Sequence, residues 1–162
     1  MSELVEIIES YRYQSLVDED GNDIGIELVQ ATTQYEISNF EVKNRIELPS
    51  ELKKLLLLSD GLLLFGIKIL SLAEMEFFPS EGILSFHSWG NGDFDCLSVG
   101  VNYPIGTIFF MSHSEENITK VNNTMQGWFK EVISEIKKNG TLLHPLDYNH
   151  REAEGMYKIY HK

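Results

Sequence analysis

Cysteine is nearly absent from this sequence, because Cys96 is the only one in 162 residues. A single thiol cannot form an internal disulfide, and it cannot build a cysteine-rich metal site. Long hydrophobic runs are absent too, since no apolar stretch approaches the roughly 20 residues of a membrane-spanning helix. The N-terminal sequence MSELVEIIES has acids where a secretory signal has basic residues. We therefore expect a soluble cytoplasmic protein that does not bind membranes.

Positive charge is scarce. The sequence has 13 lysines and arginines against 25 aspartates and glutamates, a formal net charge of −12 at pH 7. This charge repels the phosphates of nucleic acids and of anionic membranes, whose binding depends on lysine and arginine. It attracts a basic protein, although the acidity also has the simpler role of maintaining solubility. We therefore expect no nucleic-acid partner.

The usual signatures of catalysis and of cofactor binding are missing as well. There is no Gly-x-Ser-x-Gly elbow for a serine hydrolase, and no glycine-rich loop leads into a helix that holds a phosphate. None of the five histidines has a second histidine four residues away, as a zinc-binding helix requires. We interpret them as dispersed surface residues and Cys96 as a buried, inert thiol. The protein is predicted not to be an enzyme and to bind no metal or cofactor.

The chain suits one globular domain over residues 1–162, because 43% of its side chains are hydrophobic. Its strongest pattern lies at 46–72, IELPSELKKLLLLSDGLLLFGIKILSL. Pro49 is expected to open a helix, because a proline at the first helical position removes no intrahelical hydrogen bond. Leucines then recur at helical spacing, and Gly61 is expected to end the helix. Two apolar strands should follow, separated by a bend at Gly66.

A first helix after Ser2, a hairpin and a second helix are expected before this stretch. The polar run 18–23 lies between two apolar segments, which places it at a hairpin tip. Its carboxylates lack the spacing of a calcium-binding EF-hand loop. Thr33 and Glu36 form a capping box that begins the second helix. The apolar side of that helix is expected to consist of Tyr35, Ile37, Phe40, Val42 and Ile46.

Apolar segments alternate with turns after residue 81. Asn91-Gly92 is a strong hairpin signal between two such segments, and 107–111 is predicted as a further strand. A last helix should begin after Thr124 and end at Gly140. Its apolar face consists of Met125, Trp128, Phe129, Val132, Ile133 and Ile136. We predict an α+β fold with a twisted, mainly antiparallel sheet of about six strands and helices packed mainly on one face.

Two blocks of the sequence resemble the SUKH superfamily, which takes in bacterial toxin-immunity proteins and the fungal cell-wall-assembly regulator (Smi/Knr) domain. In the first block Leu48-Pro49 opens a helix, Asp60-Gly61 closes it, and Ser71-Leu72 follows a strand. In the second block, Gly92-Asp93-Phe94 follows a turn. The order and spacing of these pieces carry the resemblance, since Leu-Pro and Asp-Gly by themselves are common helix punctuation.

The resemblance is strongest over 33–140 and leaves 141–162 as a C-terminal extension. It implies an immunity protein that binds and neutralises a cognate toxin, often a nuclease, or alternatively an intracellular regulatory or scaffold domain. We expect a monomer or weak homodimer whose acidic side chains occlude the basic active cleft of the toxin. The candidate contacts are chosen by charge and turn position, and the tryptophan by its enrichment in binding hot spots. They are Asp18, Glu19, Asp20, Asp23, Trp89, Asp93, Asp95, Glu115 and Glu116.

Asp93 and Asp95 also have two other interpretations. Residues two apart on a strand point to the same face, so the pair could form the two-carboxylate site of a hydrolase. Alternatively, Asp93 accepts backbone amides at the turn while Asp95 is a solvated strand residue. Of the two tryptophans, Trp128 is expected in the core, whereas Trp89 is either a core residue or an exposed anchor.

Overall fold

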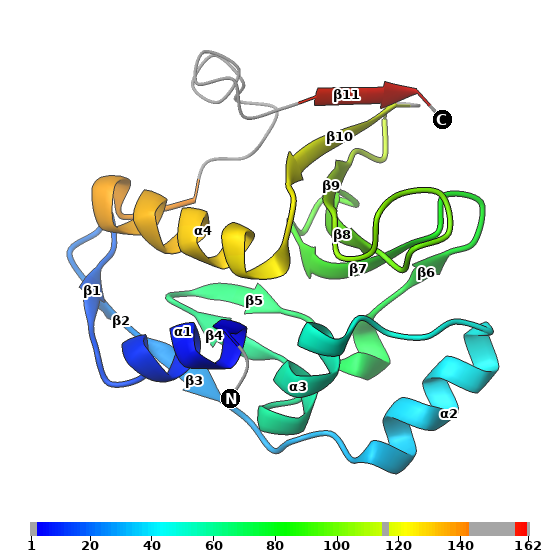
Figure 1. Cartoon of the computed structure of the whole chain (residues 1–162). Helices are drawn as coiled ribbons and strands as arrows, with labels where there is room; N and C mark the ends of the chain where they lie inside the picture. The colour runs from blue at the N-terminus through cyan, green and yellow to red at the C-terminus, as the bar shows by residue number, and fades with distance from the viewer. Residues whose placement is uncertain (1–2, 115–116, 143–157, 162) are drawn as a thin grey trace.

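The computed structural model describes residues 3–114, 117–142 and 158–161, and it shows an α+β fold (Figure 1). The helices are α1 (Glu3–Tyr11), α2 (Gln34–Asn44), α3 (Ser50–Leu58) and α4 (Met125–Asn139), with a short 3-10 turn, η1 (Leu72–Glu74). The main sheet has the order β11 (Lys158–His161), β10 (Asn117–Asn122), β9 (Ile108–Met111), β8 (Phe94–Ser98), β7 (Ile83–Ser88), β5 (Ile67–Ile69), β4 (Leu62–Leu64) and β3 (Ile26–Leu28). β6 (Phe77–Phe78) pairs with β7, and β1 (Leu16–Val17) pairs with β2 (Asp23–Ile24) as a separate ribbon.

The pairings confirm the predicted fold class. Every strand pair in the described part of the chain is antiparallel. The main sheet has nine strands, which is more than the expected six or so. A single residue pair, Ile69 with His87, joins β5 to β7. The sheet therefore consists of a long upper part and a smaller lower part formed by β3, β4 and β5 (Figure 1).

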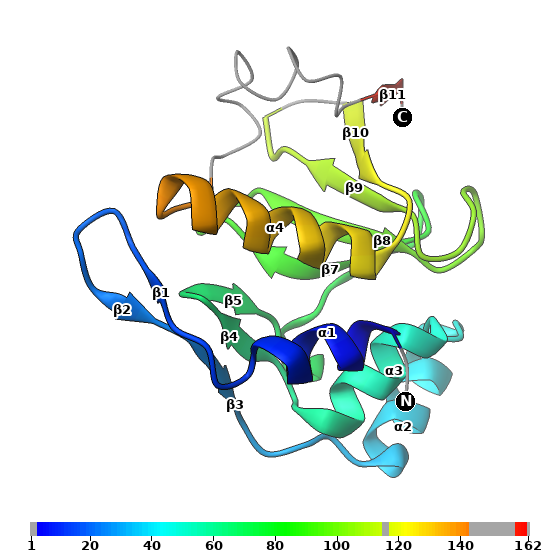
Figure 2. The same ribbon diagram turned by 60° about the vertical axis from the view of Figure 1, so that its left-hand side comes forward.

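Helices α1, α3 and α4 pack on the same face of the sheet, where the main hydrophobic core lies (Figures 1 and 2). On α4 the six residues predicted for its apolar face are all buried, Trp128 among them. The opposite face of the long part carries a smaller cluster that includes Cys96, Phe109 and Ile118. Alternate residues of the central strands face the two clusters, as the pleat of a strand requires. Both faces of these strands are therefore buried, and Cys96 is buried as expected.

The predicted helix caps are confirmed at two helices. Thr33 and Glu36 form the reciprocal capping box of α2, and the side chain of Thr124 accepts a hydrogen bond from the Gly127 N–H at the start of α4. Gly140 ends α4 in the left-handed conformation, as predicted. Caps of this kind depend on residues three or four apart, and the sequence therefore reveals them.

The prediction for the end of α3 is wrong. The helix ends at Leu58, and its C-cap is Ser59 in an extended conformation. Gly61 has the expected positive φ of 81°, but it lies in the turn that leads into β4. Pro49 stands one position earlier than predicted, as the N-cap residue. The two apolar strands after Gly61 and the bend at Gly66 are confirmed as β4, β5 and their turn.

Helix α2 buries much less than its sequence suggested. Only Ile37 is fully buried, whereas Tyr35 is 75% and Val42 is 78% exposed. The helix lies at the periphery of the molecule, beyond α3 (Figure 1). Its apolar residues do not recur at strict helical spacing, so one face cannot collect all of them. The prediction of a continuous apolar side on this helix is therefore wrong.

Candidate partner-binding surface

The polar run 18–23 forms the predicted hairpin tip between β1 and β2. One oxygen of Asp18, Oδ1, accepts the backbone N–H of Asp20 at 2.9 Å and that of Asn22 at 2.8 Å. Glu19, Asp20 and Asp23 are exposed. The hairpin projects from the body of the molecule beside the C-terminal end of α4 (Figure 2). Asp18 thus organises the tip, and its neighbours present their charge to solvent.

Acidification is expected to open this tip. The hydrogen bond from the Asn22 N–H holds the pKa of Asp18 below the ordinary 3.8. Because this pKa is lowered, the Asp18 carboxylate makes its full contribution to the stability of the tip when the pH is above the ordinary pKa. The contribution is lost as the pH falls through the lowered pKa. An NMR titration of the Asp20 and Asn22 amides from about pH 6 to about pH 2 should show both shifting together below the ordinary pKa. In the Asp18→Asn variant this change in the amide shifts should vanish. In the wild type, a change centred at the ordinary aspartate pKa would contradict the prediction.

Negative charge is concentrated in one continuous segment that contains this hairpin. Residues 13–42 include no lysine or arginine, and they include seven acids: Asp18, Glu19, Asp20, Asp23, Glu27, Glu36 and Glu41. The last two have structural roles, since Glu36 caps α2 and Glu41 binds Lys53 at 3.1 Å. Within the described residues, no salt bridge involves the acids at 19, 20, 23 or 27. Their charge therefore faces the surroundings uncompensated.

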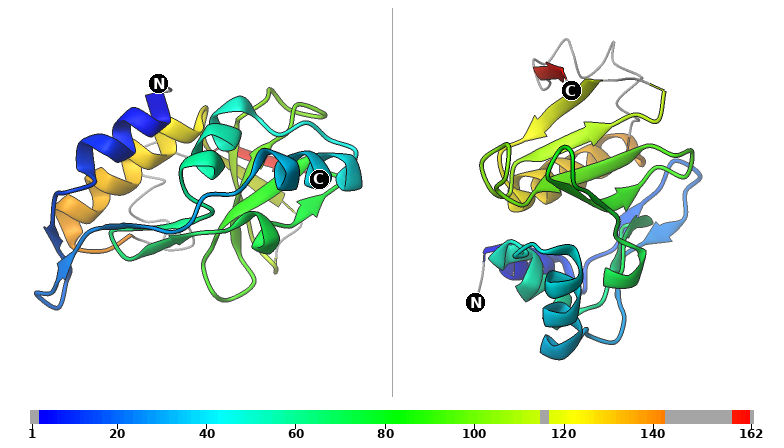
Figure 3. Two further views of the ribbon diagram at one scale, coloured as in Figure 1. Left: turned by 90° about the horizontal axis from the view of Figure 1, so that it is seen from below. Right: turned by 90° about the vertical axis from the view of Figure 1, so that its right-hand side faces the viewer.

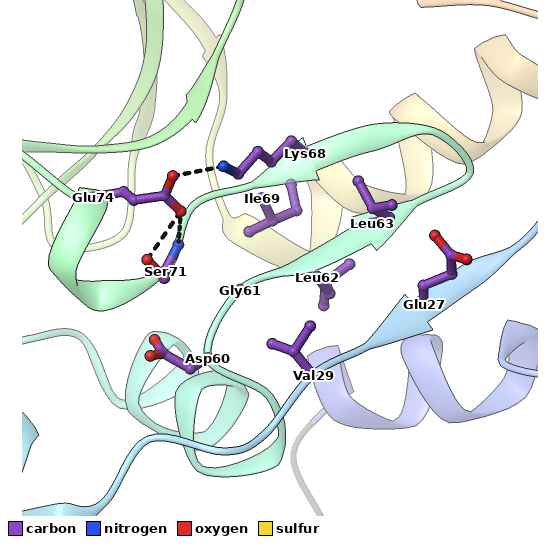
Figure 4. Close-up of a pocket in the computed structure, with 10 residues that line it drawn as sticks. All are labelled: Glu27, Val29, Asp60, Gly61, Leu62, Leu63, Lys68, Ile69, Ser71 and Glu74. Carbon is purple, nitrogen blue, oxygen red and sulfur yellow. Dashed lines mark hydrogen bonds and ion pairs between the residues drawn. The ribbon is translucent and has the colours of Figure 1, made fainter.

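A pocket of about 410 Å³ adjoins this segment at β3 (Figure 4). Val29, Leu62 and Leu63 form part of its apolar lining, and the carboxylates of Glu27 and Asp60 lie on opposite sides of them. The lysine at its edge, Lys68, binds Glu74 at 2.5 Å and thereby holds the pKa of that carboxyl below its usual range.

Two of the pairs that carry the SUKH resemblance, Asp60-Gly61 and Ser71-Leu72, meet beside this pocket and have structural roles there. Asp60 Oδ1 accepts the Leu72 N–H at 2.8 Å, which ties the end of α3 to the start of η1. The Ser71 N–H donates to Glu74 Oε1 at 3.1 Å, as part of a second capping box. A Cβ on Gly61 would lie 2.8 Å from the Ile69 carbonyl oxygen and 2.9 Å from the Ser71 nitrogen. These pairs therefore hold α3, β5 and η1 together.

Asp93 is fully buried and serves the fold. Its Oδ1 accepts the His113 N–H at 2.9 Å and lies 2.6 Å from His113 Nδ1. The aspartate therefore fastens the β7–β8 connection to the loop after β9. The His113 amide belongs to the loop after β9.

Asp95 is 2% exposed and pairs with a buried histidine, so its interpretation as a solvated strand residue is wrong. Its Oδ2 lies 2.9 Å from Nδ1 of His87, which is 3% exposed. The interpretation of His87 as a surface histidine is wrong for the same reason. The ring of His87 also packs against Trp128 and Trp89, with ring centroids 5.6 Å and 4.8 Å away. The two aspartates thus bind two different histidines.

The remaining candidate contacts are a half-buried tryptophan and two glutamates outside the described residues. Trp89 is half-buried and packs against the main core. Glu115 and Glu116 lie outside the described residues. Together with the burial of Asp93 and Asp95, this leaves the tip of the β1–β2 hairpin as the exposed part of the candidate surface. Sequence reasoning missed Glu27, although the long segment without lysine or arginine was a signal for it.

Two other features are absent from the described ranges. No three histidine, cysteine, aspartate or glutamate side chains there gather closely enough to hold a metal ion. None of the described helices has both the length and the apolar character to cross a membrane.

The fold and the signature residues define the class: an α+β domain in which a helix, a strand hairpin and a capped 3-10 turn are joined by Asp60-Gly61 and Ser71-Leu72. The chain belongs to the SMI1/KNR4 family (SUKH-1), whose model matches residues 31–131. Proteins of this family are in general immunity or regulatory domains without enzymatic activity. No curated protein and no solved structure matches the chain.

Proposed function

We propose that this protein is an immunity protein, which binds a basic toxin and neutralises it by covering the toxin's active cleft. Membership of the SUKH-1 family supports a protein partner of this kind. The observation that carries the proposal is the uncompensated charge of the segment 13–42, which is exposed at the hairpin tip and at Glu27. The contacts proposed are Glu19, Asp20, Asp23 and Glu27.

A nuclease is the class of toxin that this surface suits best. A nuclease cleft must be positively charged in order to hold the phosphates of its substrate. Carboxylates in place of those phosphates satisfy the same lysines and arginines, and they exclude the substrate. Electrostatic attraction also raises the association rate, by about 10- to 1,000-fold at low salt.

Charge reversal on the proposed surface should slow binding. The variant Asp20→Lys/Glu27→Lys is expected to associate with a basic cognate toxin at least about tenfold more slowly than the wild type, because the charge at the contact changes by four units. At about 0.5 M salt the difference should nearly disappear, since screening acts over a few ångströms there. Surface plasmon resonance at two salt concentrations measures both rates.

The matched control is Glu6→Lys/Glu76→Lys, which changes the same charge at two exposed positions outside the segment 13–42. It should keep most of the association rate, and cells that express the toxin should grow with it as with the wild type. Equal slowing in both double variants would show that only net charge matters and would overturn the proposed surface. A neighbouring partner with this charge dependence but no toxicity would favour the regulatory alternative.

A further inference from the structure

Strand β3 is the edge strand of the lower part of the sheet, and within the described chain it pairs only with β4. In the view from below, no helix or strand passes in front of it (Figure 3). An edge strand has backbone N–H and C=O groups that a further strand can bind. The pairing of β1 with β2 ends at Ile24, and the Gln14 carbonyl oxygen lies 3.5 Å from the place that a Cβ on Gly25 would occupy. Beyond Gly25, residues 26–28 pair with no other strand on this side within the described chain and form a free edge of the sheet.

The pairing pattern shows which groups this edge offers. The Gly25 carbonyl oxygen accepts the Phe65 N–H at 3.0 Å, so Gly25 is directed toward β4. In an antiparallel pair, successive residues alternate between binding the partner strand and pointing away from it. Glu27 therefore binds β4 as Gly25 does, whereas the N–H and C=O groups of Ile26 and Leu28 point outward.

The side chains on the solvent face indicate the charge of an added strand. Glu27 stands opposite Leu63, and Leu63 stands opposite Lys68, in one row across three strands. Lys68 binds Glu74, so it does not neutralise Glu27. An added strand would place one residue directly opposite Glu27, where a positive charge is favourable and a negative charge is unfavourable. Asp20 and Asp23, on the β1–β2 hairpin that precedes β3, are exposed and add negative charge to the adjoining surface.

The two faces of β3 also indicate which residue types should alternate along the added strand. One residue of the added strand lies opposite Glu27. The residues before and after it on that strand would lie on the other face of the sheet, with Ile26 and Leu28, whose side chains pack against the main core. Those positions favour apolar side chains. On the Glu27 side, the pocket lined by Val29 and Leu63 can take the aliphatic stem of a lysine or arginine.

We propose that the edge of β3 binds an extended segment of a basic partner protein as an added strand in which basic and apolar residues alternate. The proposal rests on the proposed function in one respect, namely that the partner is basic. It goes further by assigning the mode of binding. Main-chain hydrogen bonds of Ile26 and Leu28 supply affinity, and Glu27 with the adjoining pocket selects lysine or arginine.

The test uses the full chain and three short acetylated peptides, followed by NMR and amide exchange. The first peptide alternates lysine and valine, the second replaces its valines with proline at the same charge, and the third replaces its lysines with glutamate. Proline donates no backbone hydrogen bond and disrupts strand pairing. We expect the first peptide to bind at least about tenfold more tightly than either control. Exchange of the Ile26 and Leu28 amides should slow about tenfold, while that of Glu27 stays unchanged.

Variants separate this mode from charge attraction alone. Glu27→Lys should weaken the first peptide at least about tenfold, whereas Glu76→Lys should not. Equal binding of the two basic peptides, with no change at the Ile26 and Leu28 amides, would overturn the edge proposal and leave the toxin-binding proposal intact. Absence of binding by the first peptide would also overturn it. The toxin measurements described above decide the proposed function separately.

Discussion

Gly61→Ala is expected to lower the free energy of unfolding by about 3 kcal/mol or more. Two costs add at this position. An alanine pays about 1–2 kcal/mol for the left-handed conformation that Gly61 adopts, with φ of 81°. Its Cβ would also lie 2.8 Å from the Ile69 carbonyl oxygen and 2.9 Å from the Ser71 nitrogen, and relieving such overpacking costs about 1–3 kcal/mol more. Urea unfolding followed by tryptophan fluorescence measures the loss.

Gly66→Ala is the matched control. Gly66 has almost the same conformation, with φ of 82°, but nothing lies within 4 Å of the place its Cβ would occupy. It should therefore cost only the conformational part, about 1–2 kcal/mol. If the two variants lose equal stability, the close approach of the β5–η1 segment to Gly61 contributes nothing.

The parts of the fold that the sequence predicts are those that depend on near neighbours in the chain. The capping box at Thr33, the cap at Thr124 and the stop at Gly140 are all confirmed. The buried face of α4 is confirmed as well, because its apolar residues recur at helical spacing over the whole helix. Each of these features is specified within a few residues.

Other features depend on contacts between distant residues, and there sequence reasoning fails. Gly61 has the conformation of a helix stop, but α3 has already ended, because the Ser59 hydroxyl donates to the Gly61 and Val29 carbonyl oxygens and turns the chain toward β4. Nothing within the helix itself signals this. The exposure of Tyr35 and Val42 likewise depends on where α2 packs, which its own pattern does not specify.

The candidate surface shows the same limit. The hairpin tip at 18–23 follows from its polar turn residues, and the structure confirms its position. The burial of Asp93 and Asp95 does not follow from the sequence, because it depends on strand register. Asn91-Gly92 suggests a two-residue turn, whereas the Trp89 N–H donates to the Asp93 carbonyl oxygen and closes a longer loop. That loop places His87 opposite Asp95, and a one-residue change of register would move each of these side chains to the other face of the sheet.

The signature residues and the proposed contacts occupy different positions, and this division has a functional meaning. Asp60, Gly61 and Ser71 hold α3, β5 and η1 together through backbone contacts. The proposed contacts lie on the hairpin tip and on the edge strand, where a change of side chain disturbs no core. A scaffold built in this way lets its exposed charges change to suit a different protein partner while the fold stays the same.

Asp95→Ala should destabilise the protein by about 3 kcal/mol. His87 and Asp95 are both more than nine-tenths buried, with Nδ1 and Oδ2 only 2.9 Å apart. Removing the carboxylate leaves the imidazole among Trp89, Trp128 and the core without its acceptor. An unsatisfied buried polar group costs about 1–3 kcal/mol, and the cavity that the lost carboxylate leaves adds to this cost. Asp95→Asn keeps an acceptor oxygen in the same place and should therefore lose less.

The control for the loss of negative charge is Glu27→Ala, which removes an exposed carboxylate and should change stability by less than about 0.5 kcal/mol. The double variant His87→Leu/Asp95→Leu tests the cause, because it removes both polar groups together and fills their space with apolar atoms. It should be more stable than Asp95→Ala, since no buried polar group is then left without a partner. A double variant no more stable than Asp95→Ala would show that the unpaired imidazole does not account for the loss of stability.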